Sequence, residues 1–270
     1  MKQTNTGNTF ITEFTSLSEF KNYIDETPQN SVFSGNKERQ SSYTGRRSFT
    51  FTDNMEEAVR LFTDGWPQQA EELTKTLRMK DVKAENESIK FIRDVVGFQA
   101  SVPRYLNGHP KSMINKKVVT HKQKVITINK SINYACFVST ANIVIASTEA
   151  LRIVKKIEEQ GIRVNLNIIW GTKAGERNII VKVRVKNANE RLNISKLSFP
   201  LIHPSMLRRL FFRFLEVCPY TTRDFTFGYG RPLSDEENRE HNKGEYCLPS
   251  LLKYQEAHGL ESIETYRITK

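Results

Sequence analysis

The strongest constraint on the fold is an alternation of strand-like and helix-like segments that begins at residue 124. Residues 124–128 are short, β-branched and bounded by polar residues, a pattern typical of a β-strand. Residues 141–160 carry apolar side chains at helical spacing, and Gly161 follows where a helix commonly ends. This order predicts a strand followed by a helix that returns the chain to the same sheet.

Two further strands are indicated directly after this helix. Residues 162–170 and 178–186 each alternate apolar and polar side chains, as strands with two different faces do. Only residues 171–177 separate them, which is too short for a crossover helix. We therefore expect the two strands to form an antiparallel hairpin.

Parallel strands joined by helices, with one antiparallel hairpin at the edge, define an α/β, Rossmann-like open sheet. In such sheets ligands bind beyond the carboxyl ends of the strands. The loop that follows the first strand, residues 129–133, is therefore the first place to expect a site.

The other patterns are weaker, and they predict a mainly helical region before the sheet. Asp53 is a plausible helix N-cap, and Pro67 fits the first residue of a second helix. In chain order, we expect a helix at 17–24, short helices and loops at 80–116, a helix at 194–201, a longer helix starting at His203-Pro204, a strand at 245–248, a helix at 249–258 and a strand at 262–269. The predicted regions are a polar, partly flexible segment at 1–52, a helical region at 53–118 and the α/β domain at 119–270.

The net charge of +11 is concentrated in the middle of the chain. Residues 95–216 carry +15, while the parts on either side carry −2 each, and residues 95–148 contain no Asp or Glu. A cationic segment of this kind is typical of proteins that contact phosphate, and it is equally compatible with a solvated surface. The basic residues that we single out for anion or nucleic-acid contact are Lys116, Lys117, Lys122, Lys182, Arg184, Lys186, Arg208, Arg209 and Arg213.

Two groups among these cations have structural alternatives. Lys182, Arg184 and Lys186 alternate with valines, so they also fit the outer face of an edge strand, where cations prevent pairing between sheets. The three arginines between 208 and 213 also fit a solvated helix face or pairing with acidic side chains elsewhere in the fold.

Several functional classes are disfavoured by composition. No run of about 18 apolar residues exists, so we expect no membrane-spanning helix. The polar start of the chain disfavours a secretory signal, and three scattered cysteines disfavour a disulfide framework. The spacing of His, Cys, Asp, Glu and Ser residues matches no metal or catalytic motif, which favours a protein without cofactor and without catalysis, although catalytic groups can be remote in sequence.

The loop after the first strand carries a resemblance to a known family. The order of the elements, the edge hairpin and the loop Asn129-Lys130-Ser131-Ile132-Asn133 resemble the von Willebrand factor A domain, whose Asp-x-Ser-x-Ser loop binds a divalent cation. Ser131 matches the first serine, but Asn129 replaces the aspartate and Asn133 replaces the second serine. A hard cation needs anionic oxygen, so we expect a degenerate loop that holds no metal, with Asn129, Lys130, Ser131 and Asn133 instead contacting a partner.

The chain as a whole also resembles a set of tailed-bacteriophage proteins. The resemblance covers about residues 53–260 and rests on Gly65-Trp66-Pro67, on the loop at 129–133 and on His203-Pro204-Ser205-Met206-Leu207-Arg208-Arg209-Leu210-Phe211-Phe212. It implies a phage protein in the host cytoplasm, with association with the virion left open. It implies no activity.

These observations support three hypotheses. The first is a non-catalytic phage protein that acts as a protein-interaction module, an adaptor or assembly factor, through the loops at the carboxyl ends of the strands. The second is a nucleic-acid-binding protein that uses residues 95–216. The third is a hydrolase whose site is assembled from residues far apart in sequence. Partner identity and oligomeric state are left open by the sequence.

Overall fold

The computed structural model is an α/β protein with two compact units, residues 1–80 with 125–270 and residues 81–124. We call the first unit the body, and we call residues 87–120 of the second unit the arm. The structure describes residues 1–33, 35, 37–77, 87–120, 124–222, 224, 229–241 and 246–251.

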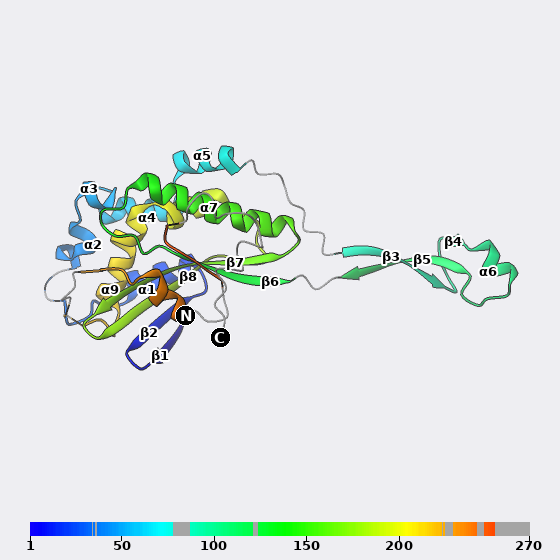
Figure 1. The fold of residues 1–270 in the computed structure, drawn as a ribbon, viewed down its shortest axis with the longest axis horizontal. Coiled ribbons are helices and arrows are strands. Elements are labelled where there is room, and N and C mark those ends of the chain that lie inside the picture. Colours follow the sequence, from blue (N-terminus) through cyan, green and yellow to red (C-terminus); the bar gives the residue numbers. More distant parts are fainter. Residues whose placement is uncertain are drawn as a thin grey trace. The chain divides into compact units, whose positions relative to one another are not determined.

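The body is built on a mixed six-stranded sheet in the order β1-β2-β8-β7-β6-β9 (Figure 1). β6 runs parallel to both β7 and β9, β7 is antiparallel to β8, and β2 adds to β8 in parallel. The strands are β1 (Lys2–Thr6), β2 (Thr9–Phe14), β6 (Val125–Ser131), β7 (Arg163–Ala174), β8 (Arg177–Lys186) and β9 (Tyr246–Leu248).

The β7–β8 hairpin is confirmed, but its position at the sheet edge is wrong. Both strands run longer than predicted, so the turn between them is only Gly175-Glu176, with Gly175 at a φ of 64°. The edge beyond β8 is covered by the β1–β2 hairpin, whose two-residue turn also starts on a glycine with positive φ, Gly7. The residues of β1 are all exposed and polar, so its sequence has no apolar alternation that would predict this hairpin.

The described helices of the body are α1 (Leu17–Glu26), η1 (Lys37–Arg39), α2 (Ser41–Thr44), α3 (Arg47–Thr50), α4 (Met55–Asp64), α5 (Pro67–Leu77), α7 (Thr140–Glu159), α8 (Ile194–Ile202), the π-helix η2 (Met206–Phe211), α9 (Phe212–Val217) and α10 (Asp235–Glu240). The predicted helices at 17–24 and 141–160 and the one starting at Pro67 are confirmed. Asn54 rather than Asp53 caps α4, because the Asn54 side chain accepts the hydrogen bond from the Glu57 amide.

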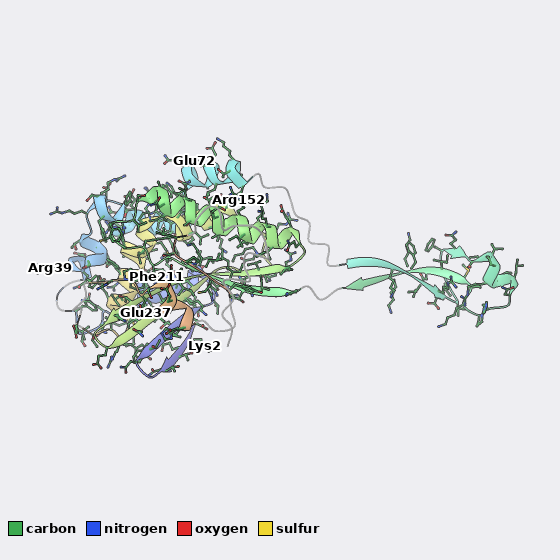
Figure 2. All side chains as sticks on the ribbon, in the orientation of Figure 1. Lys2, Arg39, Glu72, Arg152, Phe211 and Glu237 are labelled. Carbon is green, nitrogen blue, oxygen red and sulfur yellow. The ribbon has the colours of Figure 1, made fainter. Side chains whose placement is uncertain are left out.

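One apolar core holds the helical layer against the sheet. It joins buried residues of α1, α4, α5, α7, α8, η2 and α9 to the same face of β6, β7 and β8. At its centre Trp170 of β7 stacks on Phe211 of η2, with ring centres 5.6 Å apart. Figure 2 shows Phe211 among the packed side chains of the body, whereas Lys2 and Glu72 lie at its surface. A smaller cluster on the opposite sheet face contains Ile169, Ile180, Leu233 and Cys247.

The arm is a ribbon of β3 (Glu87–Asp94) and β5 (Met113–Thr120), with β4 (Gln99–Ala100) and α6 (Val102–Leu106) between them in the chain (Figure 1). The prediction of short helices and loops at 80–116 is therefore wrong for most of the described residues, and 53–118 is not one helical region. None of the side chains described between residues 90 and 117 is buried, so this stretch lacks the apolar alternation by which strands are recognised. The helix predicted at 249–258 and the strand at 262–269 lie, apart from residues 249–251, outside the described residues.

Candidate functional site

The predicted loop residues at the end of β6 are buried and bonded within the protein. Asn129 Oδ1 accepts a hydrogen bond from Asn167 Nδ2 of β7 at 2.7 Å, and Arg184 of β8 donates in turn to Asn167. The three side chains form a polar row across three neighbouring strands. The predicted contact of Asn129 with a partner is wrong, because this side chain is fully buried in the row.

Lys130 is also fully buried, and its ammonium is used inside the fold. Lys130 Nζ donates to the carbonyl oxygens of Pro249 and Ser250 at 2.5 and 2.6 Å. Burial lowers the pKa of Lys130 to about 7, against a smaller opposing effect of the Asp235 carboxylate. The side chain therefore ties the end of β9 to β6 and offers no contact to a partner.

Ser131 and Asn133 hold the turn that follows the strand. Asn133 donates from Nδ2 to the Leu233 carbonyl at 2.8 Å, and its Oδ1 accepts from the Gly171 amide at 3.1 Å. Both residues are buried, so the predicted partner-facing loop is an interior structural element. In the part of the chain that the structure describes, no group of three or more His, Cys, Asp or Glu is placed to hold a metal ion.

The cations predicted on β8 are paired inside the body. Lys182 Nζ lies 3.2 Å from Glu13 Oε1 of β2. β2 pairs with the edge of β8 that was expected to face solvent. Lys186 Nζ lies 2.6 Å from Glu158 of α7, and both side chains are buried. The pairing of β7 with β8 shifts register between Leu166 and Asn167. This bulge explains why the Lys186 side chain points toward α7, because it moves the next residue to the other face of the strand.

The three arginines of the His-Pro segment are buried rather than solvated. Arg209 donates to the carbonyl oxygens of Ser42, Tyr43, Gly45 and Thr52 and to the hydroxyls of Thr50 and Thr52. Arg213 lies 3.6 Å from the buried carboxylate of Glu216. Arg209 and Arg213 are thus used inside the fold, so a surface role in phosphate binding is wrong for these two, whereas Arg208 lines a cavity.

Two of the predicted cations do reach the surface. Lys116 and Lys117 are exposed on β5 of the arm. Lys122 lies outside the described residues.

A cavity of about 370 Å³ opens beyond the carboxyl end of β6. Four segments of the chain form its wall, and most of the wall is aromatic or aliphatic. The lining residues are Phe49, Tyr134, Ala135, Cys136, Phe137, Leu207, Arg208, Phe212, Tyr229, Gly230, Arg231 and Pro232.

Arg208 shapes this cavity by holding two of its segments. Its guanidinium donates to the carbonyl oxygens of Phe49 at 2.6 Å and Cys136 at 3.2 Å, and it lies 4.5 Å from the centre of the Phe49 ring. Burial lowers the pKa of Arg208, although the group stays charged in the accessible pH range. Arg208 thus supplies positive charge to a mostly apolar wall, as Arg231 does at another point of the lining.

Another part of the wall depends on Gly230. This residue has a φ of 64°, and a Cβ atom there would lie 2.4 Å from Phe212 Cε1. Its neighbour Tyr229 is anchored by a 3.0 Å hydrogen bond from its hydroxyl to Glu216, whose pKa burial raises. A side chain at residue 230 would therefore push into the cavity wall.

Phe137 stands at the rim and is 85% exposed, more than any other large apolar side chain among the described residues. It also borders a neighbouring groove of about 580 Å³ that shares Arg231 and contains the ion pair between Lys173 and Glu237. An aromatic ring held in water beside an apolar cavity is a feature of binding surfaces.

The lining suits binding better than chemistry. Cys136 is exposed in the wall, but none of the described lining residues of the 370 Å³ cavity is a His, Asp or Glu that could act as its base. A cavity of this size and apolar character lies within the usual range for small-molecule or side-chain pockets.

Among the described residues no helix is long and apolar enough to cross a membrane.

The cavity lies at the end of the sheet where sequence reasoning expected a site, but the residues that line it were not predicted. Phe49, Phe137, Phe212 and Gly230 come from separate segments that only the fold brings together. No local spacing links them, so no motif could have identified them.

The sequence model of the family described as "Domain of unknown function (DUF7192)" matches residues 2–267. The chain belongs to this family. The match spans both units of this DUF7192 protein, so body and arm are parts of one family architecture. No curated protein and no solved structure matches it.

Proposed function

We propose that this chain is a non-catalytic bacteriophage protein that acts as an interaction module, an adaptor or assembly factor, by binding a protein partner at the carboxyl end of the sheet. The observation that carries the proposal is the exposed ring of Phe137 beside the apolar cavity. Aromatic side chains of this kind commonly supply a large share of the binding energy at protein interfaces.

The lining defines the chemistry of the partner. Phe49, Leu207 and Phe212 favour an apolar side chain inside the cavity, while Arg208 and the exposed Arg231 favour a carboxylate close to it. We therefore propose a partner segment in which a large apolar residue lies next to Asp or Glu.

The resemblance to the von Willebrand factor A domain supports this placement. β6, β7 and β9 are parallel and β8 is antiparallel to β7, which supports the resemblance, whereas the β1–β2 hairpin takes the edge position expected for β7–β8. The loop after β6 lacks a carboxylate, so we propose that the binding surface works without a metal. Action in the host cytoplasm is part of the same proposal.

Site-specific photo-crosslinking tests the surface directly. The chain is produced in infected cells with benzoylphenylalanine at position 137, irradiated, and purified after nuclease treatment. We expect a discrete crosslinked protein that the variant Arg231→Glu weakens. Nuclease treatment leaves the product intact if the contact is a protein contact.

The matched control carries benzoylphenylalanine at Ile145, which is 48% exposed on α7 away from the cavity lining. Equal crosslinking from positions 137 and 145, or no product from position 137, would contradict the proposal.

A further inference from the structure

The arm carries a surface that the proposed function does not use. We propose that it binds single-stranded nucleic acid through one face of the β3–β5 ribbon, where exposed phenylalanine rings stack on bases and neighbouring cations contact phosphates. The inference is independent of the protein-binding cavity.

Two aromatic rings lie together on this face. Phe91 is 62% exposed and Phe98 is 56% exposed, and their ring centres are 6.1 Å apart. Each ring therefore keeps more than half of its surface in water although the two are in contact. Base stacking on exposed aromatic rings is the usual basis of binding that tolerates any sequence.

Cations stand beside the rings in register. Lys116 is directly opposite Phe91 in the antiparallel pairing, so both side chains project from the same face. Lys116 Nζ also lies 4.8 Å from the centre of the Phe98 ring. Arg93 lies two residues from Phe91 on the same strand and is exposed on the same face.

The other face of the ribbon adds positive charge to the arm. Lys90 and Lys117 are directly opposite each other and both are exposed. These two cations lie away from the aromatic face, so they raise the positive potential around the arm, which attracts a polyanion, without contacting it.

The net positive charge of the arm also favours an anionic ligand. Residues 87–120 contain six basic and two acidic residues, and no acid follows Asp94. Exposed aliphatic residues, Val95, Val96, Val102 and Leu106, occupy the connection between β3 and β5. Aliphatic side chains do not stack on bases, so the proposal rests on the aromatic and cationic face.

Fluorescence anisotropy on the full chain tests the proposal, with labelled (dT)30, (rU)30 and a 30-base-pair duplex as probes between 50 and 300 mM KCl. We expect binding to the single strands, with log K falling against log salt at a slope of about −1.4 for the two phosphate contacts of Arg93 and Lys116. The double variant Arg93→Gln/Lys116→Gln should reduce the magnitude of that slope by about 1.4.

Variants at the rings separate stacking from folding. Phe91→Leu/Phe98→Leu keeps apolar contacts within the arm and should weaken binding about tenfold or more, whereas Phe91→Tyr/Phe98→Tyr should bind like the wild type. Lys75→Gln removes one exposed charge on α5 and is the control for net charge beside the single variants Arg93→Gln and Lys116→Gln.

Three outcomes would overturn the proposal. One is no single-strand binding at 50 mM KCl, and another is binding that the arm variants do not change relative to Lys75→Gln. The third is binding only to phosphatidylglycerol vesicles, lost on the same substitutions, which would assign the face to a lipid surface.

Discussion

Trp66 and His203 meet edge to face, with ring centres 4.8 Å apart. The two residues belong to the Gly-Trp-Pro and His-Pro segments, which are far apart in sequence, and both line a second cavity of about 740 Å³. His203 is held on its other side by the stacked ring of Phe199, and its Nδ1 accepts a hydrogen bond from the Ser205 amide. The imidazole is therefore held in its neutral form.

This environment predicts a pH-dependent stability. Burial lowers the pKa of His203 to about 4, below the value near 6.5 in an unfolded chain. The unfolded state then binds the proton more readily, so stability is complete above pH 6.5 and falls as the pH drops toward 4, by roughly 3 kcal/mol in total. Urea unfolding between pH 7.5 and 4.5 measures the free energy of unfolding. Subtracting the value for His203→Phe from that for the wild type at each pH removes the contribution of the carboxyl groups, which the two proteins share. Parallel curves for the two proteins would contradict the assignment.

Lys130 should titrate far from other lysines. Its pKa of about 7 follows from burial in the sheet, and its ammonium is satisfied by two carbonyl oxygens. The folded state holds this proton less tightly than the unfolded chain does, so its contribution to stability is lost as pH falls from about 10.5 toward 7. Carbon-13 NMR of the lysine Cε atoms should show one resonance with a midpoint near pH 7, absent in Lys130→Met. A Lys130 midpoint near 10 would show that the side chain is hydrated.

Lys186 and Glu158 should be strongly coupled. Either single variant, Lys186→Met or Glu158→Leu, leaves a buried charge without its partner and should cost about 3–5 kcal/mol of unfolding free energy. The double variant should cost much less than the sum of the two. A double-mutant cycle by urea unfolding gives the coupling, and additive effects would mean that the pair is solvated. Lys75 and Glu71 form an exposed pair for comparison, with an expected coupling below about 1 kcal/mol.

Gly230→Ala should be more destabilising than Gly7→Ala. Both glycines have positive φ, so both substitutions carry a backbone cost of about 1–2 kcal/mol. Only at residue 230 does the new methyl group meet a neighbour, the ring of Phe212, which adds about 1–3 kcal/mol. Thermal unfolding of the two variants measures the difference. If the two variants lost the same amount of stability, the Phe212 ring would be free to move away from the new methyl group.

The elements of the body with a buried face were largely predictable from the sequence. The β7–β8 hairpin and α7 were predicted because one side of each is apolar and packs against the core. The β1–β2 hairpin and the β3–β5 ribbon were missed because the residues of β1 and many of those in the arm face solvent, where no apolar period is required. Their pairing depends on backbone hydrogen bonds, which leave little trace in residue type.

The sequence by itself determined the α/β class of the body, the acid-free segment at 95–148 and the absence of a carboxylate from the loop after β6. Tertiary structure alone decided which cations are available to a partner. β2 covers the strand that was expected at the edge, a bulge turns Lys186 toward Glu158, and N-terminal carbonyl oxygens surround Arg209. The reason is physical: whether a charge is solvated or paired depends on segments far away in the chain, and residue order does not record that proximity.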